Sequence, residues 1–154
     1  MVKTEKMVMF RETTEDLIRQ KRLFEVFSKS LNVNYKQFSS YSKKYRIDGF
    51  CYNSNTKDIT NWVECKWYTT KAHCYLNIPK FKELIHLSEI TFLPSYFLFR
   101  EYERWGYILL HDGKNIKCNY KVKLAGGTPK GRVVNEDDIE PLILLDTTNI
   151  VWGN

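Results

Sequence analysis

The sequence contains no long apolar run and only three histidines. A transmembrane helix needs roughly 20 consecutive apolar residues, and no stretch approaches that length. The first ten residues, MVKTEKMVMF, include no apolar segment long enough for a signal peptide. We therefore expect a cytoplasmic protein that makes no contact with a membrane.

Paired cysteine motifs are also missing. None of the four cysteines forms a C-x-x-C pair, and His73 has no second histidine at metal-ligand spacing. Free cysteine is among the most buried residue types, so we expect buried thiols rather than a zinc site or disulfides. The cysteines are Cys51, Cys65, Cys74 and Cys118.

The chain has the length and composition of one globular domain. Of its 154 residues, 43% are hydrophobic and 27% are charged, and neither a repeat nor a linker divides residues 1–154. The net charge of +6 and the pI of about 9.1 favour polyanionic partners, since cations set against phosphates release counterions. Many basic proteins bind no nucleic acid, so charge alone does not decide the function.

Sequence patterns predict an α/β protein. Apolar spacing predicts one helix from Thr13 to Leu31 and a second from Pro79 to a stop before Pro94. His73 and Tyr75 are expected in the loop before the second helix. A helix that joins strands of one sheet requires a crossover, so we expect a mixed sheet with helices packed on it. The strands are expected at residues 33–38, 45–52, 59–68, 96–99, 107–110, 116–124 and 142–145.

Two of these strands carry charges among β-formers. Glu64 and Lys66 are two residues apart, so they point to the same face of a strand. If the hairpin is symmetric about Thr56, antiparallel pairing sets Asp48 directly opposite Glu64 on that face. A slip of one residue would move the carboxylates to opposite faces.

The same register pairs Phe50 with Trp62, a favourable aromatic contact. Opposed carboxylates, by contrast, repel by roughly 4 kcal/mol at about 4 Å. A sheet tolerates Asp48 facing Glu64 if a cation lies between them or one is protonated. Mg²⁺ suits this position, and Lys66 beside it would orient or deprotonate a water molecule.

A structural interpretation competes with this one. Acid-x-Lys triplets are common, and Asp112-Gly113-Lys114 is another, in a turn that needs no functional explanation. Glu64 and Lys66 would then lie on a solvated sheet face. Charges that interrupt a β-rich segment are nevertheless a local inconsistency of the kind that marks functional sites.

Asp48 together with Glu64-Cys65-Lys66 resembles the motif of the PD-(D/E)XK nuclease superfamily, although Ile47 replaces the proline of the family name. The chain is also similar to small single-domain phage and prophage nucleases of this class. The segments that carry this wider similarity are Thr14-Glu15-Asp16-Leu17, Lys80-Phe81 and Asp138-Ile139-Glu140-Pro141.

The resemblance implies a restriction-endonuclease-like core (helix, three strands, helix, strand) with extra C-terminal strands. It also implies an Mg²⁺- or Mn²⁺-dependent deoxyribonuclease acting in phage DNA recombination, repair or degradation, in the host cytoplasm if the chain is viral. Asp48, Glu64 and the Cys65 carbonyl would hold the ion, and Lys66 would position the nucleophilic water. The partner would be DNA, and a homodimer is plausible.

One departure concerns the first helix. Many members of the superfamily carry a glutamate there that assists the metal site, whereas Gln20 occupies the expected position. Glu25 is an alternative, unless it is simply solvated. Without a third acid the site would bind metal weakly or hold one ion. The main alternative function is therefore a catalytically inactive nucleic-acid-binding module on the same fold. A phage structural protein is a third.

Further cations are candidates for nucleic-acid contact. Lys80 opposes the macrodipole at a helix N-terminus, and a phosphate bound there would resolve the conflict. An ordinary exposed lysine is the alternative. Lys43, Lys44 and Arg46 precede the Asp48 strand, where they would either follow the DNA backbone or form a solvated cluster.

Overall fold

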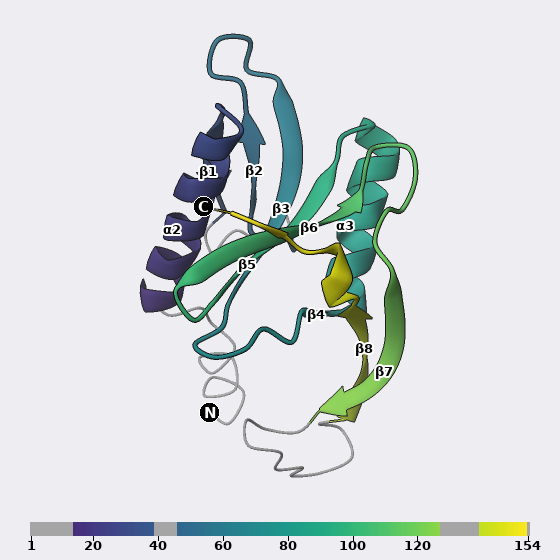
Figure 1. Ribbon diagram of the computed structural model, residues 1–154. Helices are drawn as coiled ribbons and strands as arrows, with labels where there is room; N and C mark the ends of the chain where they lie inside the picture. Colours follow the sequence, from purple (N-terminus) through teal and green to yellow (C-terminus); the bar gives the residue numbers. More distant parts are fainter. Residues whose placement is uncertain (1–13, 39–45, 127–138, 154) are drawn as a thin grey trace, which may run out of the picture.

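Two sheets and two α-helices make up the described part of the chain in a computed structural model (Figure 1). The structure describes residues 14–38, 46–126 and 139–153. The elements in chain order are α2 (Thr14–Ser30), β1 (Asn34–Gln37), β2 (Gly49–Tyr52), β3 (Ile59–Trp67), β4 (Tyr75–Asn77), α3 (Ile78–Thr91), β5 (Ser95–Glu101), β6 (Arg104–His111), β7 (Tyr120–Gly126), β8 (Ile139–Leu145), a 3₁₀ turn (Thr147–Asn149) and β9 (Val151–Trp152).

The larger sheet has the strand order β1-β2-β3-β5-β6-β9. β3 and β5 run parallel, and the other neighbours are antiparallel. Parallel neighbours cannot be joined by a tight turn, and the segment between them contains α3. The prediction of a mixed α/β sheet is confirmed.

A second sheet, with the order β4-β8-β7, was not expected. Tyr75, predicted to lie in a loop, belongs to β4, and its neighbour Leu76 is buried. β4 is three residues long, too short to show an alternating pattern, and it pairs with β8 from the far end of the chain. The strand expected from Ile116 begins instead at Tyr120.

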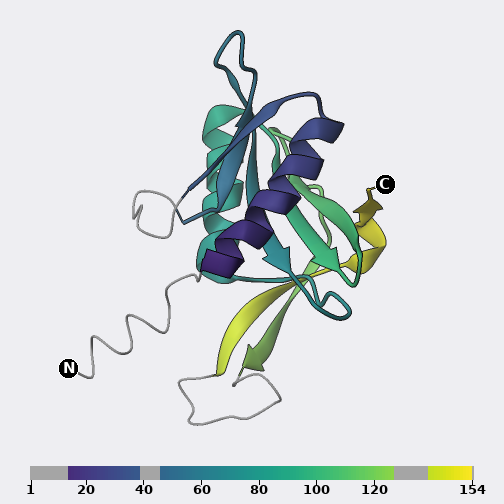
Figure 2. The same cartoon turned by 90° about the vertical axis from the view of Figure 1, so that its left-hand side faces the viewer.

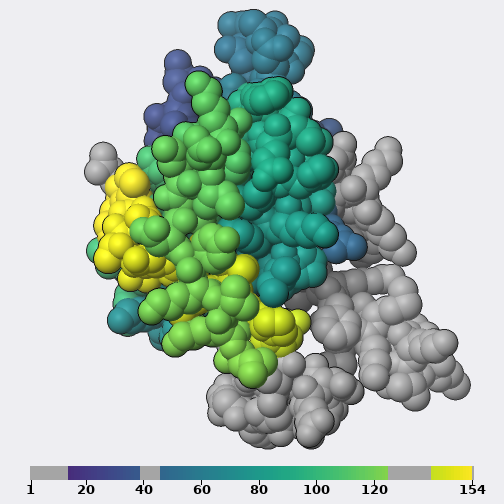
Figure 3. Space-filling model, turned by 90° about the vertical axis from the view of Figure 1, so that its right-hand side faces the viewer, coloured from purple at the N-terminus to yellow at the C-terminus, as the bar shows by residue number. Residues whose placement is uncertain are grey.

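The two helices cover opposite faces of the larger sheet. Phe24 and Phe27 of α2 pack against a cluster that includes Val63 of β3. Trp62, on the other face of β3, belongs to the cluster that contains Leu84 of α3. Figure 2 shows α2 lying across the first face, and Figure 3 shows α3 beside the segment that follows β6. The alternation of side chains along β3 therefore decides which helix each residue meets.

Local sequence sets the ends of α3. The Asn77 side chain accepts a hydrogen bond from the Lys80 backbone N–H at 2.8 Å, and Pro79 lies in the first turn as expected. At the other end Phe92 adopts a left-handed conformation (φ 59°), and its N–H donates to the Ser88 carbonyl. Both helices begin at the same end of the larger sheet (Figure 1).

The cysteine side chains are all buried and form no disulfide, as expected. Burial raises the pKa of the Cys51 thiol to about 12, so this thiol stays protonated at neutral pH. Of the two helices described, neither combines the length and the apolar character needed to cross a membrane.

Candidate functional site

The pairing of β2 with β3 brings the two candidate carboxylates together. Gly49 pairs with Val63 and Phe50 with Trp62, which is the predicted register. The rings of Phe50 and Trp62 meet edge to face at 6.0 Å. Asp48 immediately precedes β2, so the same register sets it opposite Glu64.

Asp48 is fixed by the backbone of β3. Its Oδ2 atom accepts a hydrogen bond from the Cys65 N–H at 2.8 Å, and its side chain is buried. A carboxylate held by a buried backbone donor has few alternative rotamers. Its charge is therefore presented to Glu64 in a fixed geometry.

Glu64 occupies an unfavourable position for a carboxylate. Its side chain is 1% exposed, and its Oε1 atom is buried without a hydrogen-bond donor among the described residues. Burial raises its pKa well above the ordinary value, and the charge of Asp48 raises it further, while Lys80 acts in the opposite direction. The site therefore attracts a proton or a cation.

Lys80 supplies one such cation. Its Nζ atom lies 2.7 Å from Glu64 Oε2, and 36% of its side chain remains exposed. The Asn77 cap fixes the turn from which Lys80 projects. The conflict with the helix dipole, which the sequence suggested a phosphate would relieve, is thus relieved in this structure by a buried carboxylate.

Lys66 lies on the same face of β3 as Glu64, one pleat further along. Its Nζ atom sits 4.7 Å from the centre of the Tyr75 ring, a cation–π contact with β4. The second sheet, absent from the prediction, therefore provides the support for this ammonium.

Asp48, Lys66 and Lys80 line a cleft of about 250 Å³, whereas the buried Glu64 lies behind them and is not among the lining residues. Five of the residues that line it were predicted as site residues, and three were not. The lining residues are Asp16, Arg19, Gln20, Asp48, Cys65, Lys66, Trp67 and Lys80. Asp16, Arg19 and Gln20 follow an i, i+3, i+4 spacing, which places them on one face of a helix. That spacing was visible in the sequence and identifies Asp16 as the acid that α2 brings to the cleft.

Other predicted residues lie elsewhere. Glu25 is exposed and accepts a hydrogen bond from the Tyr35 hydroxyl at 3.5 Å, so it does not substitute for Gln20 at the cleft. Gln20 itself accepts a hydrogen bond from the Gln37 amide at 3.2 Å. Arg46 lines a separate depression of about 410 Å³ beside α3, and residues 43–44 lie outside the described part of the chain.

The ligand set for a metal ion is small. Within the described residues, no three His, Cys, Asp or Glu side chains are grouped as a metal site made by side chains alone would require. Asp48 and Glu64 provide two carboxylates, and the Oε1 atom of Glu64, which has no hydrogen-bond partner within the described residues, can donate a lone pair to a metal ion. This donor set suits an ion such as Mg²⁺, which retains several waters and takes one or two carboxylates.

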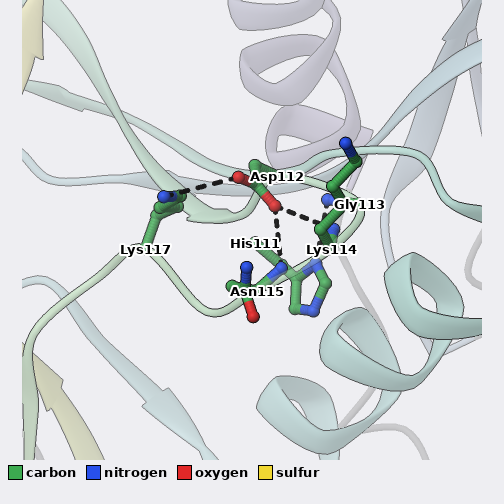
Figure 4. Close-up of polar contacts among 6 residues, drawn as sticks. All are labelled: His111, Asp112, Gly113, Lys114, Asn115 and Lys117. Carbon is green, nitrogen blue, oxygen red and sulfur yellow. Dashed lines mark hydrogen bonds and ion pairs between the residues drawn. The ribbon is translucent and has the colours of Figure 1, made fainter.

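The second acid-x-Lys triplet is structural, as expected. The Asp112 carboxylate accepts hydrogen bonds from the Lys114 and Asn115 backbone N–H groups, both at 2.8 Å, and lies 3.5 Å from Lys117 Nζ (Figure 4). These hydrogen bonds, Asn115 first, lower the pKa of Asp112, the reverse of the shift at Glu64. The same short pattern thus occurs in a satisfied turn and in an unsatisfied buried site.

Compared with models of known protein families, with curated proteins and with solved structures, the chain matches none of them. The chemistry of Asp48, Glu64 and the neighbouring lysines is therefore what indicates a function. The class that fold and cleft define together is an α/β protein with two facing carboxylates and two lysines at one end of a mixed sheet.

Proposed function

We propose that this chain is a metal-dependent deoxyribonuclease with a restriction-endonuclease-like core, similar to the PD-(D/E)XK nucleases. The observation that carries the proposal is the buried Glu64 carboxylate, which faces Asp48 and has an oxygen atom without a donor among the described residues. A structural role for this pair would leave a large electrostatic cost unexplained. The element order α2, β1, β2, β3, α3, β5, interrupted by β4, supports this part of the proposal.

Asp48 and Glu64 would hold Mg²⁺ or Mn²⁺, with the Cys65 carbonyl as the third protein ligand that the family resemblance implies. When bound, such an ion polarises the phosphoryl group and lowers the pKa of a coordinated water. The buried Cys65 N–H fixes Asp48, and the rigid β3 strand fixes Glu64, so the two ligands need no rearrangement of the backbone.

Two lysines would act on the substrate. Lys66 is braced on the Tyr75 ring and would orient the attacking water and offset the charge that develops on the phosphoryl oxygens. Lys80 is partly exposed at the rim and would contact a phosphate at the N-terminal end of α3. The overall charge of +6 favours a polyanionic substrate.

A catalytically inactive nucleic-acid-binding module on the same fold is the second candidate. The ion pair between Lys80 and Glu64 favours it, because an internal ammonium already neutralises the carboxylate that a metal ion would need. In that case the site would be a buried ion pair under a DNA-binding surface. A homodimer, common among nucleases that cut two strands, stays a prediction.

A plasmid-nicking assay separates the two candidates. We expect the wild-type protein to nick supercoiled plasmid with Mg²⁺, and we expect EDTA to stop the reaction. The variant Lys66→Ala should also stop it, while Lys114→Ala, which changes the matching lysine of the structural turn, should cut normally. Salt-sensitive binding of DNA without any cutting would instead support the inactive module.

A further inference from the structure

Trp67, which follows Lys66 in β3, lines the cleft, and its ring makes cation–π contacts with two arginines. The Arg100 guanidinium carbon lies 4.4 Å from the centre of the Trp67 ring, and that of Arg19 lies 5.7 Å from it. The three residues come from β5, α2 and β3, and Arg100 is the neighbour of Trp67 in the parallel pairing. Tertiary structure thus gathers two positive charges on one aromatic ring at the edge of the cleft.

Arg100 is arranged to bind an anion. Its Nε–H donates to the Tyr102 carbonyl at 2.9 Å, which fixes the guanidinium plane against Trp67 and leaves the terminal nitrogens available. Among the described residues no carboxylate lies within ion-pair distance of it. A guanidinium stacked in this way presents a rigid fork that matches two oxygens of a phosphate.

Arg19 is held less strongly. Its partner Glu15 accepts a hydrogen bond at 2.8 Å, but the Glu15 side chain is 71% exposed. Exposed ion pairs of this kind contribute little stability. A phosphate can therefore replace Glu15 at little cost, while Trp67 keeps the guanidinium in place.

We propose that Arg19 and Arg100, both braced on Trp67, bind backbone phosphates of the nucleic-acid strand next to the phosphate that is cut. The inference rests on the proposed nuclease function. The two arginines contact phosphates only, so their contribution to binding is independent of the base sequence. The two arginines lie on the α2 side of the sheet, and Lys80 lies on α3. The nucleic-acid strand therefore crosses the site between Lys80 and the two arginines.

The chain contains a matched control. The Arg104 guanidinium carbon lies 3.5 Å from the centre of the Trp152 ring, and the guanidinium forms an ion pair with Glu101. Arg104 neighbours Trp105, which pairs with Arg100, so strand alternation puts Arg104 on the opposite face of the sheet. Replacing Arg104 removes the same charge and the same kind of contact away from the proposed strand path.

The test is the salt dependence of DNA binding, measured by fluorescence anisotropy with the full chain in EDTA and two duplexes of unrelated sequence. Each phosphate contact adds about one to the slope of log affinity against log salt. We expect Arg100→Gln and Arg19→Gln each to reduce the slope by about one on both duplexes, and Arg104→Gln to leave it unchanged. Glu15→Gln should tighten binding, because it removes the group that competes for Arg19.

The outcomes separate this inference from the proposed function. If the wild type nicks plasmid with Mg²⁺ but neither Arg100→Gln nor Arg19→Gln changes the slope of log affinity against log salt, phosphate binding by the two arginines is refuted. The proposed nuclease function then still stands. If the wild type cuts no plasmid but both variants reduce the salt slope, phosphate binding by the two arginines is supported and the nuclease function is not. A wild type that binds no DNA at low salt refutes both. The Arg19 side chain remains 32% exposed, so its variant decides the matter even if Arg100→Gln does not fold.

Discussion

The buried carboxylate pair makes a prediction about stability. Asp48→Asn removes one of two facing negative charges, but the amide oxygen can still accept the hydrogen bond from the Cys65 N–H. The new amide N–H also provides a donor for the orphaned Oε1 atom of Glu64. We therefore expect this variant to be more stable than the wild type when divalent ions are absent.

The size of the effect follows from Coulomb's law. Two full charges at about 4 Å repel by roughly 4 kcal/mol at an effective dielectric constant near 20. Lys80, 2.7 Å from Glu64, and partial protonation of Glu64 offset much of this. We expect a gain of about 1–2 kcal/mol, which for a protein of this length raises the Tm by about 3–6 °C.

The pH dependence has a definite sign. The pKa of Glu64 is raised in the folded state, by burial first and by Asp48 second. The corresponding stability is fully present below the ordinary pKa of a glutamate and is lost as the pH rises through the folded-state pKa. The gain from Asp48→Asn should therefore be small near pH 4 and reach its full size at alkaline pH.

Thermal unfolding in EDTA, followed by circular dichroism between pH 4 and 9, measures this effect. Asp112→Asn is the control, because it removes a carboxylate from an exposed turn and should give no gain. Addition of Mn²⁺ should stabilise the wild type by about 2.7 kcal/mol at a hundredfold excess over Kd, and Asp48→Asn much less. The reasoning is refuted if Asp48→Asn melts at or below the wild type at pH 8, or if Mn²⁺ stabilises both equally.

Three further predictions concern single residues around the cleft. Lys80→Met removes the ammonium that competes for Glu64, so titration calorimetry should show Mn²⁺ binding several-fold more tightly at alkaline pH; weaker binding would contradict this. Asn77→Ala removes the cap of α3 and should cost about 1 kcal/mol in urea unfolding, whereas an unchanged midpoint would mean that the cap is dispensable. Gln20→Glu adds an acid to the cleft and should tighten Mn²⁺ binding, and an unchanged Kd would show that α2 does not reach the ion.

The register of the β2–β3 hairpin could be predicted because two independent signals agreed. Symmetry about the turn and the alternation of aromatic residues both pair Phe50 with Trp62. The register does shift, but at Tyr52, near the turn and beyond the residues that position the site. Packing of the large rings against the core resists a slip that would expose them.

The contacts of the site could not be predicted in the same way. The distance between Lys80 and Glu64 depends on how α3 packs against the larger sheet, and the support for Lys66 depends on a three-residue strand that pairs with β8. Neither relation leaves a periodic trace in the sequence. Asp16 differs, because its helical spacing with Gln20 was visible and only the expectation of a glutamate directed attention to Glu25.

In the proposed nuclease, the electrostatics of the cleft would link the binding of a substrate phosphate to the binding of a metal ion. In this structure the Lys80 ammonium is paired with Glu64, one of the two facing carboxylates. A substrate phosphate that binds Lys80 would weaken its hold on Glu64 and leave that carboxylate facing Asp48 with less compensation. The affinity of the carboxylates for a divalent cation must then rise, and by reciprocity a bound cation must favour the exchange of Lys80 onto phosphate. The Lys80–Glu64 ion pair, which favours an inactive module when taken alone, is thus the element that would couple metal binding to the arrival of DNA.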